Sequence, residues 1–227
     1  MSFITKLNAI VEELKSDSSK LVAHYKVLPP DLEAINRAEE KLGYKLDTSI
    51  INFYKECGGV QLLWLDENND NFDRLPSKLP LEENLDQWYI KGEHLSFFPE
   101  GSIWIPSIET VFNTDWTDLI FADKDEFDSS ITHDYEDFKI QVFDWFSSFN
   151  DVAFLINGTS NPPLVLGDDN GATYSESYLI DFNLYLELLI KSKGSIEVRV
   201  DFLNKNTNRE LEETISLNDI DNLEVAL

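Results

Sequence analysis

The segment AEEKLGYKLDTSIINFYKECGGV, residues 38–60, contains the start and stop signals of two consecutive helices. Apolar side chains recur at helical spacing up to Gly43, which stands where a left-handed cap is expected. Asp47 can cap the start of a second helix, and the Gly58-Gly59 pair ends it. The apolar run directly after the glycines is short and bounded by turn residues, which is typical of a buried strand. The segment therefore predicts two helices joined by a tight turn and followed by a strand.

Cys57 lies near the end of this segment and is the chain's only cysteine. A nucleophilic cysteine needs a nearby base or cation to hold the thiolate. The three histidines are scattered along the chain, and the adjacent Glu56 would raise the thiol pKa. We therefore interpret Cys57 as a packing residue, since free cysteine usually behaves as a small buried hydrophobe. A single cysteine also excludes an internal disulfide, which suits a reducing compartment.

Short helices and strands are predicted on both sides of this segment. Residues 3–14 and 178–190 show helical periodicity. Strands are predicted at 103–107, at 139–146 and 152–157 as a hairpin, within 163–171, and at 195–202, where polar and apolar residues alternate. Helices first, then several strands, then a helix favour the α+β class over a parallel α/β sheet.

The composition fits one globular core. Of the 227 residues, 42% are hydrophobic and 12% aromatic, which is enough apolar surface for one ordinary core, or for one core with an appended module. No apolar run approaches the length of a membrane span, and the first residues lack the apolar core of a signal peptide. We therefore expect a soluble, cytoplasmic protein that does not bind a membrane.

Negative charge dominates the composition. The chain has 43 acidic and 18 basic residues, a formal net charge of −25 and a sequence pI near 4.2. Such a field repels nucleic acid and anionic lipid, and it attracts basic proteins. Solubility or adaptation to salt would also explain this composition, so charge alone does not identify a partner.

Tests for catalytic and metal sites give no match. Cysteine and histidine are too few and too scattered for zinc. Residues 66–77 match a calcium loop at its first three ligand positions, but Asn71 replaces the turn glycine and Ser77 replaces the bidentate glutamate. GDDNG at 167–171 lacks the lysine of a phosphate loop. Carboxylates are too numerous for one pair to indicate a glycosidase. We therefore predict no enzyme, no cofactor and no metal site.

Ten residues near the opening segment resemble the N-terminal signature of the SUKH superfamily. They are Ile35, Ala38, Glu39, Leu42, Gly43, Leu46, Phe53, Tyr54, Gly58 and Gly59. That superfamily contains fungal Smi/Knr cell-wall regulators and bacterial immunity proteins that neutralise toxins. Asp47 stands where the family usually has proline, and either residue can start the helix. Looser similarity extends over most of residues 30–191, and the resemblance implies that the ten signature residues are structural.

The resemblance implies one α+β domain with a mostly antiparallel, multi-stranded sheet and helices packed against it. We place this domain at residues 1–194 and expect a C-terminal strand and a polar tail at 195–227. The resemblance also implies binding rather than catalysis.

The leading functional hypothesis is an immunity protein that binds and neutralises a cognate bacterial toxin domain. The charge favours a basic toxin, such as a nuclease, whose surface must be basic to hold phosphate. The alternative hypothesis is a non-catalytic regulatory scaffold of the Smi/Knr type, whose acidic surface docks cellular proteins. An enzyme that uses an unrecognised carboxylate pair has no motif in its favour.

The predicted partner-binding surface is where acids and aromatics interleave, because tight inhibition needs desolvated anchors beside the charges. Its predicted members are Asp66, Glu67, Asp70, Phe72, Asp73, Trp88, Asp115, Trp116, Asp118, Asp123, Asp125, Glu126 and Asp128. The alternative for each tryptophan is a core position, and for each acid an ordinary solvated charge.

Overall fold

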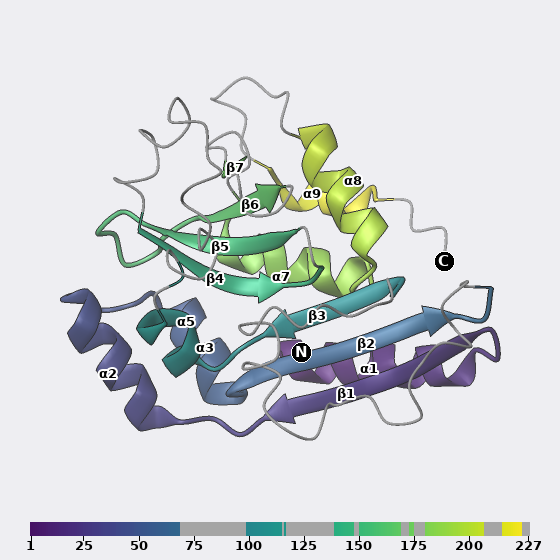
Figure 1. Cartoon of the computed structure of the whole chain (residues 1–227), viewed down its shortest axis with the longest axis horizontal. Helices are drawn as coiled ribbons and strands as arrows, with labels where there is room; N and C mark the ends of the chain where they lie inside the picture. The colour runs from purple at the N-terminus through teal and green to yellow at the C-terminus, as the bar shows by residue number, and fades with distance from the viewer. Residues whose placement is uncertain are drawn as a thin grey trace, which may run out of the picture.

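Seven strands form two small antiparallel sheets in the computed structural model, which describes residues 1–68, 99–114, 116, 139–147, 150–168, 173–174, 180–206 and 215–223. The first sheet has the order β1 (Lys20–Leu28), β2 (Gly59–Asp66) and β3 (Gly101–Ile105). The second has the order β4 (Lys139–Trp145), β5 (Asp151–Ile156), β6 (Leu164–Asp168) and β7 (Thr173–Tyr174). Strands β3 and β4 lie side by side, so the two sheets meet along this seam (Figure 1). The predicted α+β class is confirmed.

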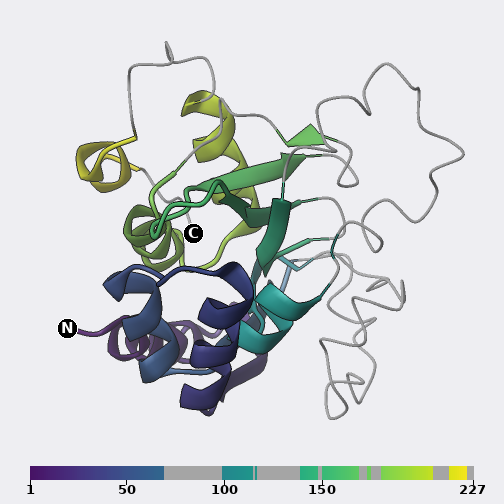
Figure 2. The same cartoon turned by 90° about the vertical axis from the view of Figure 1, so that its left-hand side faces the viewer.

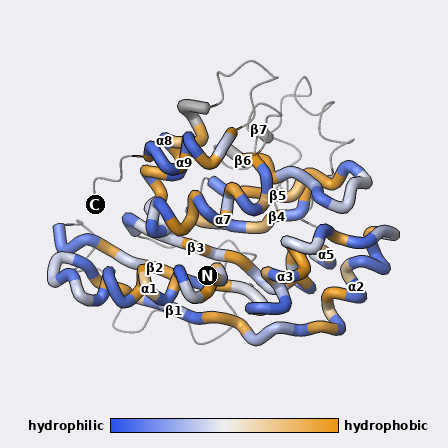
Figure 3. Tube along the Cα trace, turned by 180° about the vertical axis from the view of Figure 1, so that it is seen from behind, coloured by the Kyte–Doolittle hydropathy of each residue, from blue (hydrophilic) through white to orange (hydrophobic). Residues whose placement is uncertain are grey.

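The described residues also form seven helices, some of which cover one face of the sheets. They are α1 (Phe3–Ser16), α2 (Leu32–Leu42), α3 (Thr48–Glu56), α5 (Ile108–Asn113), α7 (Phe182–Lys191), α8 (Ile196–Asn206) and α9 (Leu217–Asp221). Seen from behind, α1 lies across the first sheet and α7 across the second (Figure 3). The view from the side shows α1 and α7 on the same side of the strands (Figure 2). These helices therefore bury one face of the two sheets.

The two predicted helices of the opening segment form as the capping residues indicate. Gly43 adopts the left-handed conformation, with φ of 78°, at the end of α2. Asp47 caps α3, because its carboxylate accepts the backbone N–H of Ser49 at 2.8 Å. The strand predicted after the two glycines is β2. Local capping chemistry thus determines the fold of this region.

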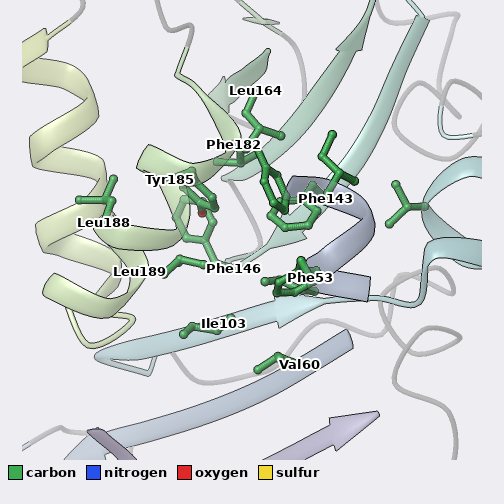
Figure 4. Close-up of a cluster of buried hydrophobic side chains, with 14 of the residues drawn as sticks. Phe53, Val60, Ile103, Phe143, Phe146, Leu164, Phe182, Tyr185, Leu188 and Leu189 are labelled. Atoms are coloured by element: carbon green, nitrogen blue, oxygen red, sulfur yellow. The ribbon is translucent and has the colours of Figure 1, made fainter. Parts of the chain in front are cut away.

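The main core lies between the sheets and the helices, and its centre is aromatic (Figure 4). The ring of Phe53 from α3 contacts those of Phe143 from β4 and Phe182 from α7, with centroids 5.9 and 5.8 Å apart. Phe143 and Phe182 also contact each other at 5.3 Å. Edge-to-face aromatic contacts add specific packing to the burial of apolar area. The core therefore joins the signature helix α3 to the second sheet and to α7.

The strand predicted at 195–202 is wrong, because residues 196–202 belong to helix α8. The buried side chains here are those of Ser195, directly before the helix, and of Arg199, Phe202 and Leu203 within it, and they follow the helical spacing i, i+4, i+7 and i+8. The apolar alternation of the sequence indicated the opposite, since it assumed that a charged residue must face solvent. Arg199 faces the core instead. Sequence reasoning also missed one strand, β1, which lies between α1 and α2 in the chain and pairs with β2.

Candidate partner-binding surface

Three of the thirteen predicted partner-binding residues lie in the described part of the chain: Asp66, Glu67 and Trp116. The other ten lie outside the described residues: Asp70, Phe72, Asp73, Trp88, Asp115, Asp118, Asp123, Asp125, Glu126 and Asp128. The predicted Asn-Gly turn at 170–171 also lies outside them.

Asp66 closes the end of the first sheet. Its carboxylate accepts a hydrogen bond from Lys20 Nζ at 2.5 Å and another from the Asn68 backbone N–H at 2.9 Å. These two donors, with the Lys20 bond the larger contribution, lower the Asp66 pKa to about 2. The Asp66 backbone N–H in turn donates to Glu100 Oε2 at 2.8 Å. Asp66 is therefore an ionised side chain with a structural partner, and only part of its charge faces solvent.

Glu67 is the exposed acid beside this ion pair. Its backbone N–H donates to the Ser19 carbonyl at 2.8 Å, which extends the pairing of β1 and β2 by one residue. Its side chain faces solvent, as does that of Asp17 on the neighbouring turn. Together with Asp66 and Glu100, these residues give this end of the sheet an acidic rim.

Trp116 is buried rather than exposed, with 3% of its surface accessible. Its indole N–H donates to the Val111 carbonyl at 2.8 Å, and its ring lies 6.1 Å from that of Trp145. It packs with Val142, Ala153 and other apolar residues of the second sheet on the face opposite the main core. A buried side chain whose N–H is already bonded cannot contact a partner. Trp116 is therefore a core residue, which is the alternative given for each tryptophan.

The two predicted acidic stretches leave the first sheet at opposite ends. Asp66 ends β2, whereas the stretch after α5 follows the far end of β3, where Ile105 pairs with Val60. Asp66 lies six residue steps along β2 from Val60, which corresponds to about 20 Å. Figure 1 shows α5 at one end of the sheet and the end of β2 at the other. The described residues therefore do not bring these two stretches together.

Three of the signature residues, Glu39, Gly58 and Gly59, have close contacts within the described fold. Glu39 is buried, and its carboxylate accepts the Leu46 backbone N–H at 3.1 Å and a hydrogen bond from Lys45 Nζ at 2.5 Å. A Cβ at Gly58 would lie 2.0 Å from the Pro29 carbonyl oxygen. Gly59 has a φ of 149°, and a Cβ there would lie 2.5 Å from the Ile105 carbonyl oxygen. The paired glycines are therefore required where β2 passes between β1 and β3.

Cys57 is fully buried next to these glycines, so the packing interpretation is confirmed. Burial raises the pKa of its thiol to about 12, and the nearby Glu56 carboxylate adds to the rise. At neutral pH the side chain is a thiol rather than a thiolate, which makes it a poor nucleophile. Among the residues that the structure describes, no group of three or more histidine, cysteine or acidic side chains could hold a metal ion.

Sequence reasoning missed a buried ion pair between Asp144 of β4 and Arg199 of α8. Both side chains have no accessible surface, and Nη1 lies 2.9 Å from Oδ2. The Tyr185 hydroxyl donates to the same Oδ2 at 2.8 Å, and the Trp104 backbone N–H donates to Oδ1 at 2.7 Å. Burial raises the pKa of Asp144, whereas the guanidinium opposes that rise.

A sequence signal for this pair existed, because Asp144 interrupts an apolar strand and Arg199 is the one basic residue of an alternating polar and apolar segment. A charge inside such a segment is either an exposed position or a paired buried one, and pairing depends on tertiary structure. The role of this ion pair is structural. Each polar group of the carboxylate and of the guanidinium has a partner within the protein, and none faces solvent.

Comparison with known proteins places the chain in a family. No helix within the described residues has the length and apolar character needed to cross a membrane. Neither the curated proteins nor the solved structures include a significant match. Residues 29–183, from the end of β1 to the start of α7, match the SMI1 / KNR4 family (SUKH-1). The match covers more than half of the chain and includes all ten signature residues. The chain therefore belongs to the SMI1 / KNR4 family (SUKH-1).

Proposed function

We propose that this protein is an immunity protein that binds a basic toxin domain and neutralises it without catalysis. The observation that carries the proposal is the uneven distribution of charge in a member of this family. Residues 1–60, which hold the signature, have 9 acidic and 8 basic residues. Residues 61–138 have 19 acidic and 4 basic residues, a net charge of −15. Solubility alone requires no such concentration of charge in one third of the chain.

A basic toxin is the partner that this charge fits best. A nuclease must present a basic surface to hold phosphate, and the acidic middle part of the chain would compete for that surface. Electrostatic attraction of this strength supports association rates near ~10⁸ M⁻¹s⁻¹ at low salt. Exposed charges contribute little affinity once they are screened over ~8 Å at physiological salt. The acids therefore account for fast recognition, and apolar anchors must account for slow dissociation.

The proposed contact surface differs from the sequence hypothesis in one residue. Trp116 is a core residue, so the aromatic anchors that remain in the proposal are Phe72 and Trp88. Glu67 is an exposed acid that a partner can reach directly. Asp66 would contribute less, because Lys20 already neutralises it. Glu67 and the two aromatic residues are therefore the first positions to test.

The experiment that tests the function has two stages. The purified protein is immobilised, lysate of the source organism is passed over it, and bound proteins are eluted with a salt gradient and identified by mass spectrometry. The proposal predicts one basic polypeptide in stoichiometric amount. That polypeptide is then expressed, and its toxicity in cells and its activity in vitro are measured with and without the protein. We expect the protein to inhibit the polypeptide fully at a 1:1 ratio. If the polypeptide binds the protein but remains equally toxic, the proposal is contradicted.

A second candidate function is a regulatory scaffold, which the family's SMI1 / KNR4 description favours. A scaffold would bind several cellular proteins with moderate affinity through the same acidic surface. The capture experiment separates the two functions, because a scaffold would retain a set of non-toxic proteins that elute together at low salt.

A further inference from the structure

The connection between β5 and β6 begins with an exposed Asn-Gly pair, Asn157 and Gly158. Gly158 has a φ of 81°, which lies in the left-handed region that glycine adopts without strain. A Cβ placed on Gly158 would find no atom within 4 Å, so the space beside this residue is open. The peptide between Asn157 and Gly158 therefore lies in an exposed loop, with no side chain at position 158 to shield its nitrogen.

The neighbouring Thr159 holds the carboxamide group of Asn157. The side-chain oxygen, Oδ1, accepts the Thr159 backbone N–H at 3.1 Å and the Thr159 hydroxyl at 2.6 Å. The side-chain nitrogen, Nδ2, has no hydrogen-bond partner among the described residues. Two donors aimed at one carbonyl oxygen stabilise the negative charge that forms there when a nucleophile attacks the carbon. The loop thus polarises the carbon of this carboxamide without binding its nitrogen.

We propose that Asn157 is a site of spontaneous deamidation, which Thr159 promotes in the folded protein. Asparagine is among the chemically labile residues of proteins. The nucleophile is the backbone nitrogen of Gly158, which is joined to the Asn157 side chain through the chain itself, so its attack on Cγ is intramolecular. The reaction therefore requires neither an enzyme nor a cofactor, and its only co-reactant is water.

Ring closure and hydrolysis are the two steps of this reaction. In the first, the Gly158 nitrogen forms a bond to Asn157 Cγ, while the two donors of Thr159 stabilise the charge on Oδ1. The bond between Cγ and Nδ2 then breaks, Nδ2 takes up the proton that the Gly158 nitrogen loses, and ammonia leaves a succinimide ring. In the second step, water adds to either carbonyl carbon of the ring and opens it. The products are aspartate, or isoaspartate with the backbone passing through the former side chain.

Deamidation changes the loop at a point that contacts the starts of two helices. The Ser160 carbonyl accepts the Asp47 backbone N–H at 2.6 Å, directly before α3. Asn161 Nδ2 donates to Asp181 Oδ2 at 3.1 Å, directly before α7. Aspartate keeps the length of the backbone and can still accept both hydrogen bonds from Thr159. Isoaspartate adds a methylene group to the backbone, which shifts Ser160 relative to Asp47. Both products add a negative charge, and isoaspartate also loosens the start of α3.

Peptide mapping tests the proposal on the intact, folded protein. The purified chain is incubated at mildly alkaline pH, and mass spectrometry follows aspartate and isoaspartate at position 157 separately from every other asparagine. We expect both products at position 157. Conversion should be at least ~10-fold slower in Gly158→Ala, whose side chain shields the nitrogen and disfavours the left-handed backbone. If Asn157 stays unchanged in the folded protein while it converts in urea-unfolded protein, the proposal is overturned.

Variants of Thr159 separate promotion by the folded loop from the chemistry of any Asn-Gly pair. Thr159→Val removes the hydroxyl donor and should slow conversion of the folded protein ~5-fold, whereas Thr159→Ser keeps the donor and should stay within ~2-fold of wild type. In urea these proteins should differ less than ~2-fold, because the hydrogen bonds of the loop are then absent.

Thr48→Val is the matched control, since it makes the same change on the exposed first turn of α3 and should leave the rate at position 157 within ~2-fold of wild type. Equal rates for folded wild type and folded Thr159→Val would overturn the proposal. A slowing by Thr159→Val that is as large in urea as in the folded protein would also overturn it.

Discussion

The two edges of strand β3 are satisfied by different chemistry. Toward β2, pairing is a regular antiparallel ladder from Val60 and Ile105 to Trp64 and Gly101. Toward β4, the partners are a turn, one guanidinium and one carboxylate. A ladder distributes its hydrogen bonds over many residues and tolerates most side chains. The seam depends on two side chains, so single substitutions should affect the two edges very differently.

The largest effect is expected from removing one member of the buried pair. Asp144→Leu leaves the guanidinium of Arg199 buried without its anion and should lower the free energy of unfolding by about 3–5 kcal/mol. Chemical denaturation monitored by tryptophan fluorescence measures this loss.

The double variant Asp144→Leu/Arg199→Met is the control for this prediction. It removes both charges together, so it should be less destabilised than the sum of the two single variants. Additive effects of the two changes would show that the charges do not act as a pair.

A substitution at Gly59 should disturb the edge of β3 that pairs with β2. In Gly59→Ala the new Cβ meets the Ile105 carbonyl oxygen of β3 and the backbone is held at an unfavourable φ. We expect a loss of about 2–3 kcal/mol in the free energy of unfolding. Gly43→Ala is the comparison: it shares a positive φ but has open space around the Cβ, so it should cost only about 1 kcal/mol. Equal losses in the two variants would contradict the contact at β3.

A substitution at Cys57 measures how much stability is lost when only packing is removed. Cys57→Ala removes a buried sulfur beside the ladder without leaving a charge unpaired, and it should cost about 1–2 kcal/mol while partner binding is retained. Because the thiol pKa is about 12, the wild-type thiol should react with a disulfide reagent at pH 8 only as fast as the protein unfolds. Rapid labelling of the folded protein would contradict the burial.

The ion pair at the end of β2 should give the smallest effect. The Asp66 pKa is lowered to about 2, so its stabilising contribution is fully present above the unfolded value of 3.8 and is lost as pH falls through 2. After screening by solvent, Asp66→Asn should cost about 1 kcal/mol at pH 7 and almost nothing near pH 2. Urea denaturation of both proteins at the two pH values measures the difference. A cost that stays the same at pH 2 would show that the charge is not responsible.

Prediction from sequence succeeded where the structure is local. Gly43, Asp47 and the Gly58-Gly59 pair specify caps and a turn within a few residues, so the signature region could be predicted closely. The strand of residues 59–66 and the β4–β5 hairpin followed from short apolar runs for the same reason.

Prediction failed where tertiary pairing decides. Ile196, Val198 and Val200 alternate with charged residues, whereas the side chains buried in the structure are those of Arg199, Phe202 and Leu203, at helical spacing. β1 was missed because Pro29-Pro30 and polar residues flank it, and its pairing with β2 involves residues about forty positions away. Trp116 could have been a core or an interface residue, since sequence does not state which side of a sheet is covered.

Association kinetics with the captured partner would test the central functional claim most directly. Two variants carry the same change in charge. One neutralises Asp118, Asp123, Asp125 and Glu126 in the acidic middle part, and the other neutralises Glu12, Glu33, Glu40 and Glu197, which are exposed on α1, α2 and α8. We predict that the first variant associates about 10-fold more slowly at low salt and with a weaker salt dependence, while the second stays within about 3-fold of wild type. Equal slowing in both variants, or an association rate independent of salt, would contradict a binding surface in the acidic middle part of the chain.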